Sequence, residues 1–239
     1  MASDWRVLWS LLRGQSRAAD HRARLEDFYA PQAEDYDRVR ERMLHGRREL
    51  CAQLAALLPA GFRLAEFGAG TARNLAFLED RLAEGRCWAV DLCPALLERA
   101  RQRIAAQRWT TVEAVEADVT RWQAPEPLDA VLMSYSLTMI PDWFAAIDNA
   151  LAQLKPGGLL AVVDFYVSRP HPEPGLVRHG WWERAFWPLW FGHAGVRPQP
   201  DLLPYLRYRA QTLALVEGRG RLPWTPWRAP YFRFLGRRA

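Results

Sequence analysis

Two glycines and three acidic residues of this 239-residue chain stand where they could bind a polar small molecule. The glycines belong to EFGAGTARN, residues 66–74, which begins within the apolar run FRLAEF. Glu66 precedes the first glycine by two residues, while Asp91 and Asp118 close two later strand-like runs, RCWAVD and TTVEAVEAD. Glycine lets a backbone approach a ligand closely, and carboxylates accept hydrogen bonds from hydroxyl and amino groups. The pattern therefore predicts a site for a ligand that carries several such donors.

The glycine loop could serve three ligand classes, of which the residues favour one. A P-loop requires GK[ST] after its first glycine, and that motif is missing. A dinucleotide loop requires a small residue at the last position of GxGxxG, where this chain has Arg73. The third ligand is S-adenosylmethionine, with Glu66 accepting from its ammonium group directly or through water. Asp91 would then accept the ribose hydroxyls and Asp118 the adenine amino group, while Val119 donates its backbone N–H to the ring.

The elements that must position these residues follow from the hydrophobic periodicity. We expect strands at 62–67, 86–91, 110–118, 127–137 and 159–167, and helices at 72–83, 94–105 and 142–154. Strands that alternate with helices in this way form βαβ crossovers and a parallel sheet covered on both faces. Ligands of such sheets bind outside the carboxyl ends of the strands, so the three acids are expected to converge on one cleft there.

The N-terminal residues 1–60 are expected to form a helical cap. Helices are predicted at 24–44, with an interruption near Pro31, and at 47–58. An earlier helix is predicted from an apolar stripe at helical spacing, formed by Trp5, Leu8, Trp9 and Leu12. An amphipathic helix that presents tryptophan is suited to docking at a membrane interface.

Residues 61–239 are expected to form the main domain together with this cap. Its last part is predicted to hold an aromatic helix at 176–191 and a hairpin of strands from 205–218 and 226–237. The predicted fold class is therefore α/β. It is a three-layer Rossmann-like fold with a mostly parallel seven-stranded sheet, a C-terminal antiparallel hairpin and an N-terminal helical cap.

Composition and charge narrow the class of protein. No stretch approaches the roughly 20 apolar residues of a membrane-spanning helix. The three cysteines are an odd number without CxxC spacing, so we expect reduced thiols in the cytoplasm and no metal site. Residues 165–239 hold 12 arginines against 4 acidic residues, together with 15 of the 29 aromatic residues. Such a segment is able to face an anionic membrane or nucleic acid, or it merely covers the core.

Residues 62–166 resemble the class I S-adenosylmethionine-dependent methyltransferases. The glycine loop, the acids at the strand ends, DAVLMSYSL and LKPGGLLAVVDF occur in the order of that family. The resemblance implies S-adenosylmethionine as cofactor and a cap that closes over it, with Tyr36 beside the sulfonium and Arg47 on the carboxylate. The cofactor-binding residues expected are Tyr36, Arg47, Glu66, Gly68, Ala69, Gly70, Asn74, Asp91, Leu92, Asp118, Val119 and Ser134.

The methyl acceptor is indicated by stretches outside the cofactor motifs. After the fourth strand, SYSLTMIPDW lacks the [DNS]PP[YFW] tetrad of enzymes that methylate adenine, cytosine or glutamine. Four stretches, 28–47, 134–143, 200–209 and 226–238, are similar to the methyltransferases of bacterial betaine-lipid synthesis. This resemblance implies successive methylation of the amino group of diacylglyceryl-homoserine, a lipid that a partner enzyme would make. It also implies a cytoplasmic protein, peripheral on the inner face of the cytoplasmic membrane, with no nucleic-acid partner.

Aromatic side chains are expected to line the acceptor site, because aromatic faces attract a methylated ammonium. Tyr36, beside the transferred methyl group, and Tyr135, facing the acceptor, are the catalytic candidates. No side chain stands out as a dedicated base, so catalysis is expected to rest on in-line placement of nitrogen, methyl and sulfur. The substrate-binding residues expected are Tyr29, Tyr135, Trp143, Trp181 and Trp182.

Three alternative functions remain open at this point. A methyltransferase that acts on a soluble metabolite or a quinone precursor would need no basic aromatic surface. An RNA methyltransferase or RNA-binding protein would use the arginine-rich C-terminal segment, although that segment has no recognised RNA-binding motif. A regulator that binds the cofactor without chemistry would share the same cleft.

Overall fold

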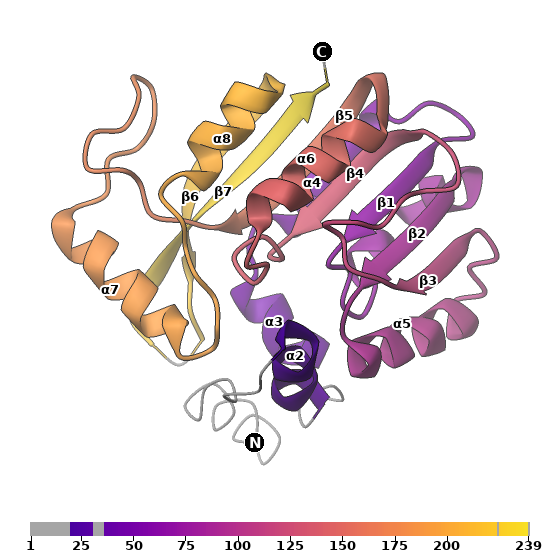
Figure 1. The fold of residues 1–239 in the computed structure, drawn as a ribbon, viewed down its shortest axis with the longest axis horizontal. Helices are drawn as coiled ribbons and strands as arrows, with labels where there is room; N and C mark the ends of the chain where they lie inside the picture. Colours follow the sequence, from indigo (N-terminus) through magenta and orange to yellow (C-terminus); the bar gives the residue numbers. More distant parts are fainter. Residues whose placement is uncertain (1–19, 31–35, 224, 239) are drawn as a thin grey trace.

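Seven strands form one mixed sheet in the computed structural model, which describes residues 20–30, 36–223 and 225–238 (Figure 1). Their order across the sheet is β3-β2-β1-β4-β5-β7-β6. Strand β7 pairs antiparallel with both β5 and β6, whereas the other neighbouring strands pair in parallel. The parallel strands in chain order are β1 (Arg63–Phe67), β2 (Arg86–Asp91), β3 (Val112–Glu116), β4 (Leu128–Ser134) and β5 (Leu154–Phe165). The C-terminal hairpin is formed by β6 (Gln211–Arg221) and β7 (Arg228–Arg237). The predicted fold class is thereby confirmed.

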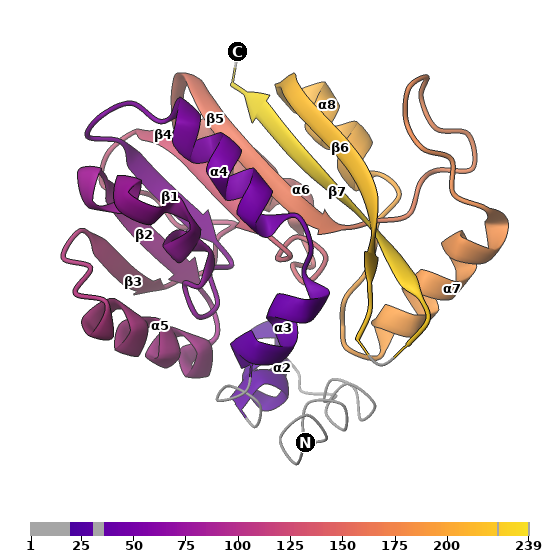
Figure 2. The same ribbon diagram turned by 180° about the vertical axis from the view of Figure 1, so that it is seen from behind.

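Helices cover both faces of this sheet. The face seen in Figure 1 carries α6 (Trp143–Gln153) and α8 (Leu202–Arg209). The opposite face, seen in Figure 2, carries α4 (Arg47–Leu57), which packs beside the 3-10 helix η2 (Asn74–Glu84). Helix α5 (Pro94–Ala106) packs against β2 and β3. It begins with Pro94, at a position in the first turn where the backbone N–H has no partner within the helix.

Three further helices lie beyond the edge where the parallel strands end. In both ribbon views α2 (His21–Tyr29) and α3 (Tyr36–Met43) lie below the ends of the central strands (Figures 1 and 2). On the same side of the molecule, α7 (Trp181–Gly192) packs beside the β6–β7 hairpin. One apolar cluster joins these helices to the sheet, since it contains Phe28 of α2, Phe165 of β5 and Trp187 of α7.

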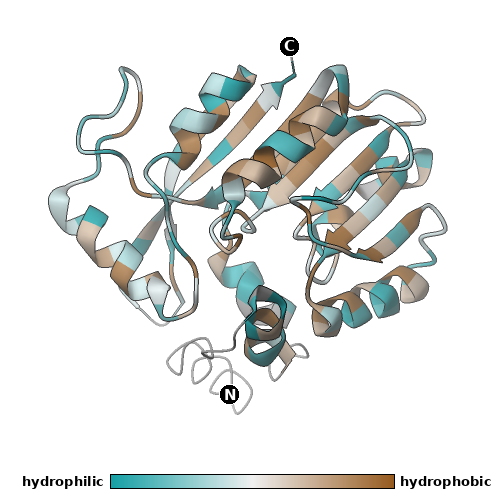
Figure 3. Cartoon of the chain, in the orientation of Figure 1, coloured by the Kyte–Doolittle hydropathy of each residue, from teal (hydrophilic) through white to brown (hydrophobic). Residues whose placement is uncertain are grey.

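Side chains of each central strand alternate between two buried layers. Ala65 and Phe67 of β1 pack in the layer under α6 and α8, whereas Leu64 packs in the layer under α4 and η2. Both faces of a parallel sheet are covered, so its strands are apolar on both sides. Figure 3 shows this as hydrophobic colouring concentrated in the central strands.

Several predicted elements differ from the structure. Residues 202–209, which the sequence assigned in part to a strand beginning at residue 205, form helix α8, and the strand begins only at Gln211. The aromatic helix begins at Trp181 and not at residue 176. The helix predicted at 72–83 is a 3-10 helix over Asn74–Glu84. The predicted helix at residues 5–12 lies outside the described residues.

The predicted division between cap and main domain at residue 60 stays a prediction. The last cap helix ends at Leu57 and β1 begins at Arg63, and α4 packs directly on the sheet and on η2. Within the described residues, no helix is both long and apolar enough to cross a membrane.

Candidate active site

The glycine loop after β1 turns sharply at the edge of the sheet where the parallel strands end. The backbone N–H groups of Gly68 and Ala69 both donate to the carbonyl of Val90, at 2.9 and 3.0 Å. Gly68 has a φ of 72°, a left-handed conformation that favours glycine. A Cβ atom at Gly68 would lie 2.4 Å from Cβ of Ser136, so a side chain at this position would collide with the loop after β4.

Asp91, at the end of β2, is held in place by the two loops beside it. Its Oδ2 accepts a hydrogen bond from the N–H of Gly70 at 2.7 Å, and its Oδ1 accepts from the N–H of Cys93 at 2.9 Å. Burial raises the pKa of this carboxyl, while those hydrogen bonds favour the charged form. A carboxylate has more acceptor positions than these two bonds use, so Asp91 can still accept from a ligand.

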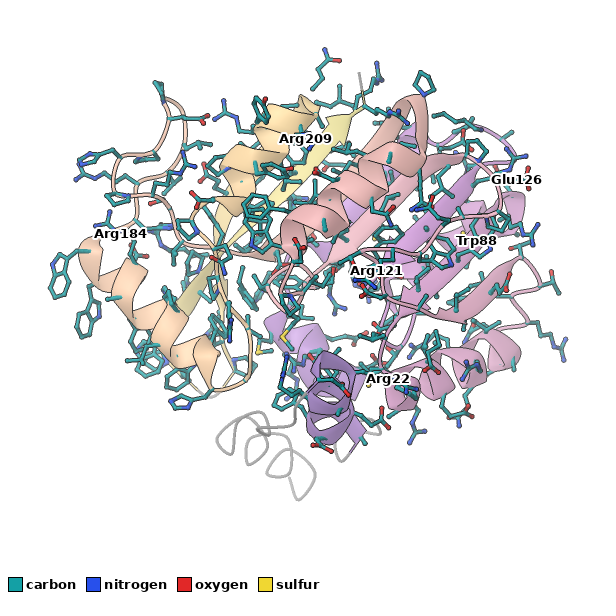
Figure 4. All side chains as sticks on the ribbon, viewed as in Figure 1. Arg22, Trp88, Arg121, Glu126, Arg184 and Arg209 are labelled. Carbon is teal, nitrogen blue, oxygen red and sulfur yellow. The ribbon has the colours of Figure 1, made fainter. Side chains whose placement is uncertain are left out.

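Asp118, just after β3, is fixed by a local turn. Its Oδ1 accepts hydrogen bonds from the N–H and the hydroxyl of Thr120, at 2.9 and 2.8 Å. Oδ2 of Asp118 has no such bond in the described structure and is exposed enough to meet a ligand. Beside it, the buried Val119 and the arginine labelled Arg121 in Figure 4 line the same wall of the cavity.

Glu66, Asn74 and Arg47 form a buried polar chain that links β1, η2 and α4. The amide nitrogen of Asn74 donates to Oε1 of Glu66 at 2.6 Å, and Nη1 of Arg47 donates to the amide oxygen of Asn74 at 3.1 Å. Burial raises the pKa of Glu66 to about 8, against the lowering effects of Asn74 and Arg47. Oε2 of Glu66 has no hydrogen-bond partner among the described atoms. A fully buried carboxyl with an unused oxygen and a raised pKa is expected to hold a proton near neutral pH.

A cavity of about 310 Å³ opens at this edge between the cap helices and the sheet. It is lined by twelve of the residues that the sequence singled out, namely Tyr29, Arg47, Gly68, Ala69, Gly70, Asn74, Asp91, Leu92, Asp118, Val119, Ser134 and Tyr135. Asp91 and Asp118 therefore share one cleft, as expected. Glu66 does not line the cavity, because its side chain lies on the α4 face of β1 and Asn74 separates it from the opening.

Three expected substrate-binding residues lie elsewhere, and these expectations require correction. Trp143 at the start of α6 is buried in the layer under α6 and α8, where its ring stacks on Phe144 at 3.6 Å between centroids. Trp181 and Trp182 are exposed at the start of α7 and do not line the cavity. Tyr36 begins α3, but its side chain is outside the described part of the structure, so its predicted role stays a prediction.

Tyr135 lines the cavity in an unusual conformation. Its φ of 53° is rare for a residue other than glycine, and strained residues of this kind cluster at functional sites. The hydroxyl donates to the carbonyl of His45 at 2.7 Å, and the ring packs edge-on against Phe165. Burial raises the pKa of Tyr135 well above its ordinary value. The phenol therefore stays neutral. Its ring forms part of the cavity lining, and its hydroxyl joins the loop after β4 to the segment between α3 and α4.

The sequence analysis missed a second link between cap and sheet. Asp37 on α3 accepts a hydrogen bond from the hydroxyl of Thr71 at 2.6 Å and pairs with Arg103 of α5, whose guanidinium also donates to the carbonyl of Thr71. Asp37 lines the cavity, so this link holds α3 against the glycine loop. The sequence shows that Asp37 is an acidic residue within a predicted helix, but it does not show that Thr71 and Arg103 lie beside it in the fold.

The opposite wall of the cavity comes from the loop after β4. This loop contributes the apolar residues Met139, Ile140 and Pro141. Its shape depends on Asp164 at the end of β5, whose carboxylate accepts from the N–H of Thr138 at 3.2 Å and from its hydroxyl at 2.7 Å. Burial raises the pKa of Asp164 to about 7.

Part of this chain is similar to known methyltransferases. Residues 64–158 match the sequence pattern described as a methyltransferase domain. Over 125 residues the chain is 30% identical to a trans-aconitate 2-methyltransferase of Escherichia coli. The aligned residues make up 52% of this chain and 46% of that protein. The chain thus spans about half the length of the curated relatives it matches.

Solved structures share the whole fold at low sequence identity. The N-methyltransferase NodS from Bradyrhizobium japonicum, in complex with S-adenosyl-L-homocysteine, has a TM-score of 0.60 at 18% identity, over 80% of this chain and 85% of that one. The 1,6-didemethyltoxoflavin-N1-methyltransferase of Burkholderia thailandensis has a TM-score of 0.61 at 22% identity, over 94% and 92% of the two chains. Residues 64–158 therefore match a methyltransferase domain, and the chain shares its fold with S-adenosylmethionine-dependent methyltransferases of known structure.

Proposed function

We propose that this protein transfers methyl groups from S-adenosylmethionine to the amino group of a lipid headgroup. The acceptor we favour is diacylglyceryl-homoserine, methylated in successive rounds to the trimethylated betaine lipid. A separate enzyme would supply this lipid, and the protein would work peripherally at the inner face of the cytoplasmic membrane.

The observation that carries the methyl-donor assignment is the order of polar groups along the cavity. Arg47 and Asn74 lie at one end, where a guanidinium and an amide suit the carboxylate and ammonium of the methionine part. Asp91 lies next and suits the two ribose hydroxyls, while Asp118 and Val119 suit the edge of the adenine ring. The glycine loop lies between these ends, and the positive φ of Gly68 and Gly70 gives it a turn in which the backbone can approach a ligand.

The acceptor would meet the donor at the wall formed by Tyr29 and Tyr135. Their aromatic rings favour a cationic product by about 0.5–2 kcal/mol each, depending on how far water is excluded. Bound S-adenosylmethionine would supply an electrophilic methyl group to the lone pair of the amine, and S-adenosylhomocysteine would leave with the electrons of the broken carbon–sulfur bond. The proton of the ammonium is lost to water before attack, which is feasible because an α-amino group titrates near pH 8.

Two features support a lipid as the acceptor. The stretches similar to the betaine-lipid methyltransferases include the cap helix α3 and the loop after β4, and both contribute lining residues of the cavity. The cavity lining also includes a set of apolar residues, Leu25, Leu44, Met139, Ile140 and Pro141. Apolar lining of this kind suits the carbon chain of a glyceryl ether better than a polyanionic metabolite.

A methyltransferase of a soluble small molecule is the second candidate. One observation favours it: a similar protein of Escherichia coli is a trans-aconitate 2-methyltransferase, and the similar Burkholderia structure holds 1,6-didemethyltoxoflavin. Arg73 and Arg121 at the cavity wall could pair with the carboxylates of such an acid. The two candidates therefore differ in whether the acceptor is a lipid headgroup or a soluble small molecule.

Lipid mass spectrometry of cells separates the two candidates. Cells would express the protein with and without an enzyme that makes diacylglyceryl-homoserine, and the Asp91→Ala variant would serve as the inactive control. We expect mono-, di- and trimethylated lipid only when both active proteins are present. Unmethylated lipid in those cells, together with turnover of trans-aconitate by the purified protein, would contradict the lipid assignment.

A further inference from the structure

Helix α7 is apolar on two faces, and only one of them is covered. Trp187 and Phe191, one turn apart, are buried in the cluster that also holds residues of α2 and β5. On the other face Trp182, Leu189 and Trp190 are 63%, 72% and 41% exposed. A surface helix normally buries one apolar stripe and shows polar residues on the opposite side. The exposed stripe of α7 therefore calls for an explanation beyond the fold of this chain.

The exposed aromatics form one continuous surface with the turn between β6 and β7. Phe186 stacks on Trp182 on one side and on Trp190 on the other, with centroids 6.2 and 5.8 Å apart. Trp227 of the turn packs edge-on against both Phe186 and Trp190, at 5.0 and 4.8 Å. We call this surface the α7 face, and it consists of Trp181, Trp182, Phe186, Leu189, Trp190 and Trp227.

This concentration is specific to one part of the molecule. Ten large apolar side chains are exposed in the described structure, and five of them belong to the α7 face. The others, such as Leu57, Tyr208 and Leu213, belong to different elements. Scattered exposed apolar residues are normal for a soluble protein, whereas a contiguous patch marks a surface that binds a partner.

The charge around the α7 face is positive. The four acidic residues between 165 and 238 all have partners within the chain: Glu173 pairs with Arg207, Glu183 with Arg219, and Asp201 with Arg169, while Glu217 accepts from the hydroxyl of Tyr166. Among the described ion pairs none involves Arg178, Arg184 or Arg228, which flank or belong to α7 and the turn. Arg184 is labelled on α7 in Figure 4.

Helix α7 packs against residues that line the cavity. The buried side of α7 shares one apolar cluster with Leu25 and Tyr29 of α2, and both of these residues line the cavity. In both ribbon views α7 and α2 lie beyond the same edge of the sheet (Figures 1 and 2). A flat partner that covered the α7 face would thus lie near the cap that encloses the site.

We propose that the α7 face binds the surface of a lipid bilayer that contains anionic lipids. Tryptophan has an amphipathic ring that favours the interface between headgroups and acyl chains, and arginines near the surface are attracted to anionic headgroups. The proposal deepens the proposed function, because it names the surface by which the enzyme reaches a lipid substrate. It does not depend on which lipid is methylated, since it concerns binding and not turnover.

Vesicle flotation of the full-length protein tests this proposal. Wild type is compared with the triple variant Trp182→Ala, Trp190→Ala and Trp227→Ala, on vesicles of phosphatidylglycerol with phosphatidylcholine and on phosphatidylcholine alone. We expect wild type to float with the anionic vesicles, and the variant to bind them about tenfold or more weakly, because it buries less apolar area at the interface. A second variant with Arg178→Glu and Arg228→Glu is expected to lose about fivefold or more per arginine changed, and this loss should shrink in high salt.

A matched control keeps the test specific. The triple variant Leu57→Ala, Tyr208→Ala and Leu213→Ala removes equally exposed apolar side chains from other elements and should bind vesicles as wild type does. Because all three positions of the aromatic variant are exposed, its unfolding transition should match that of wild type. Equal vesicle binding by wild type and the aromatic variant would overturn the proposal, whether or not the enzyme methylates a lipid. A wild-type dimer in solution that the aromatic variant abolishes would also overturn it, in favour of a second copy as the partner.

Discussion

Two regions of the molecule differ in how their functional side chains are held in place. One is the cavity wall at the ends of β1, β2 and β3, and the other is the α7 face. At the cavity wall Asp91 accepts hydrogen bonds from the backbone N–H groups of Gly70 and Cys93, and Asp118 accepts from the N–H and hydroxyl of Thr120. On the α7 face the exposed rings contact one another and leave much of their area to solvent. The first region is preorganised before any ligand arrives, whereas the second gains its burial only when a partner covers it.

This difference has a consequence for mutations. A change at the cavity wall removes a ligand contact and also disturbs internal hydrogen bonds, so binding and stability should change together. A change on the α7 face removes a side chain that contributes little to the folded chain alone, so binding should change while stability stays the same. Three predictions, from the largest expected effect to the smallest, test this separation.

The strongest contrast is between two tryptophans that the sequence had grouped together. Trp143→Ala should lower the free energy of unfolding by about 3–5 kcal/mol, because it opens a cavity in the layer under α6 and α8. Trp181→Ala should change it by about 0.5 kcal/mol or less, because that side chain is 71% exposed. Urea unfolding followed by far-ultraviolet circular dichroism measures both. Similar losses for the two variants would mean that the α7 face is part of the folded core and that the contrast is wrong.

The two tryptophans also show where sequence reasoning fails and why. An aromatic residue can bind a methylated ammonium, but residue type does not say whether tertiary packing places it in a core, a cavity or solvent. Trp143 follows a loop that lines the cavity, yet the first turn of α6 directs it into the core. Helix α8 was missed for a related reason. Its buried residues Leu202, Leu203 and Leu206 follow helical spacing, but the neighbouring aromatic residues also suit a strand.

The position of Asp91 in the cofactor site was predictable because the topology of a parallel sheet fixes where the strand ends lie. The strand 86–91 was predicted with the bounds that β2 has, and in a parallel sheet the residue at its end must face the cleft. Glu66 is the instructive exception among the acids. Its position on the strand places it on the face covered by α4, and only the structure shows that Asn74 stands between it and the cavity.

The second prediction concerns Asp91 itself. Asp91→Ala should weaken the binding of S-adenosylhomocysteine about a hundredfold, because the ribose hydroxyls lose a charged acceptor and the N–H groups of Gly70 and Cys93 lose their partner. Isothermal titration calorimetry measures the affinity. The same variant should unfold at lower urea concentration, whereas Glu113→Ala, an exposed acid on the neighbouring strand β3, should alter neither property. Unchanged affinity in Asp91→Ala would remove this residue from the cofactor site.

The smallest expected effect is a pH dependence of stability that arises from Glu66, which lies buried behind Asn74, and that the α7 face lacks. The pKa of Glu66 is about 8 in the folded protein, above its ordinary value of 4.5, so between these limits the folded chain holds a proton that the unfolded chain has released. The free energy of unfolding should therefore fall as pH rises from about 5 to 8, and Glu66→Gln should flatten that slope. The effect is limited because Asn74 and Arg47 favour the charged carboxylate and offset part of the burial. Urea unfolding at several pH values measures the slope, with Glu113→Gln as the exposed control. A slope unchanged by Glu66→Gln would contradict the prediction and leave the other buried carboxyls with raised pKa values, Asp91 and Asp164, as its source.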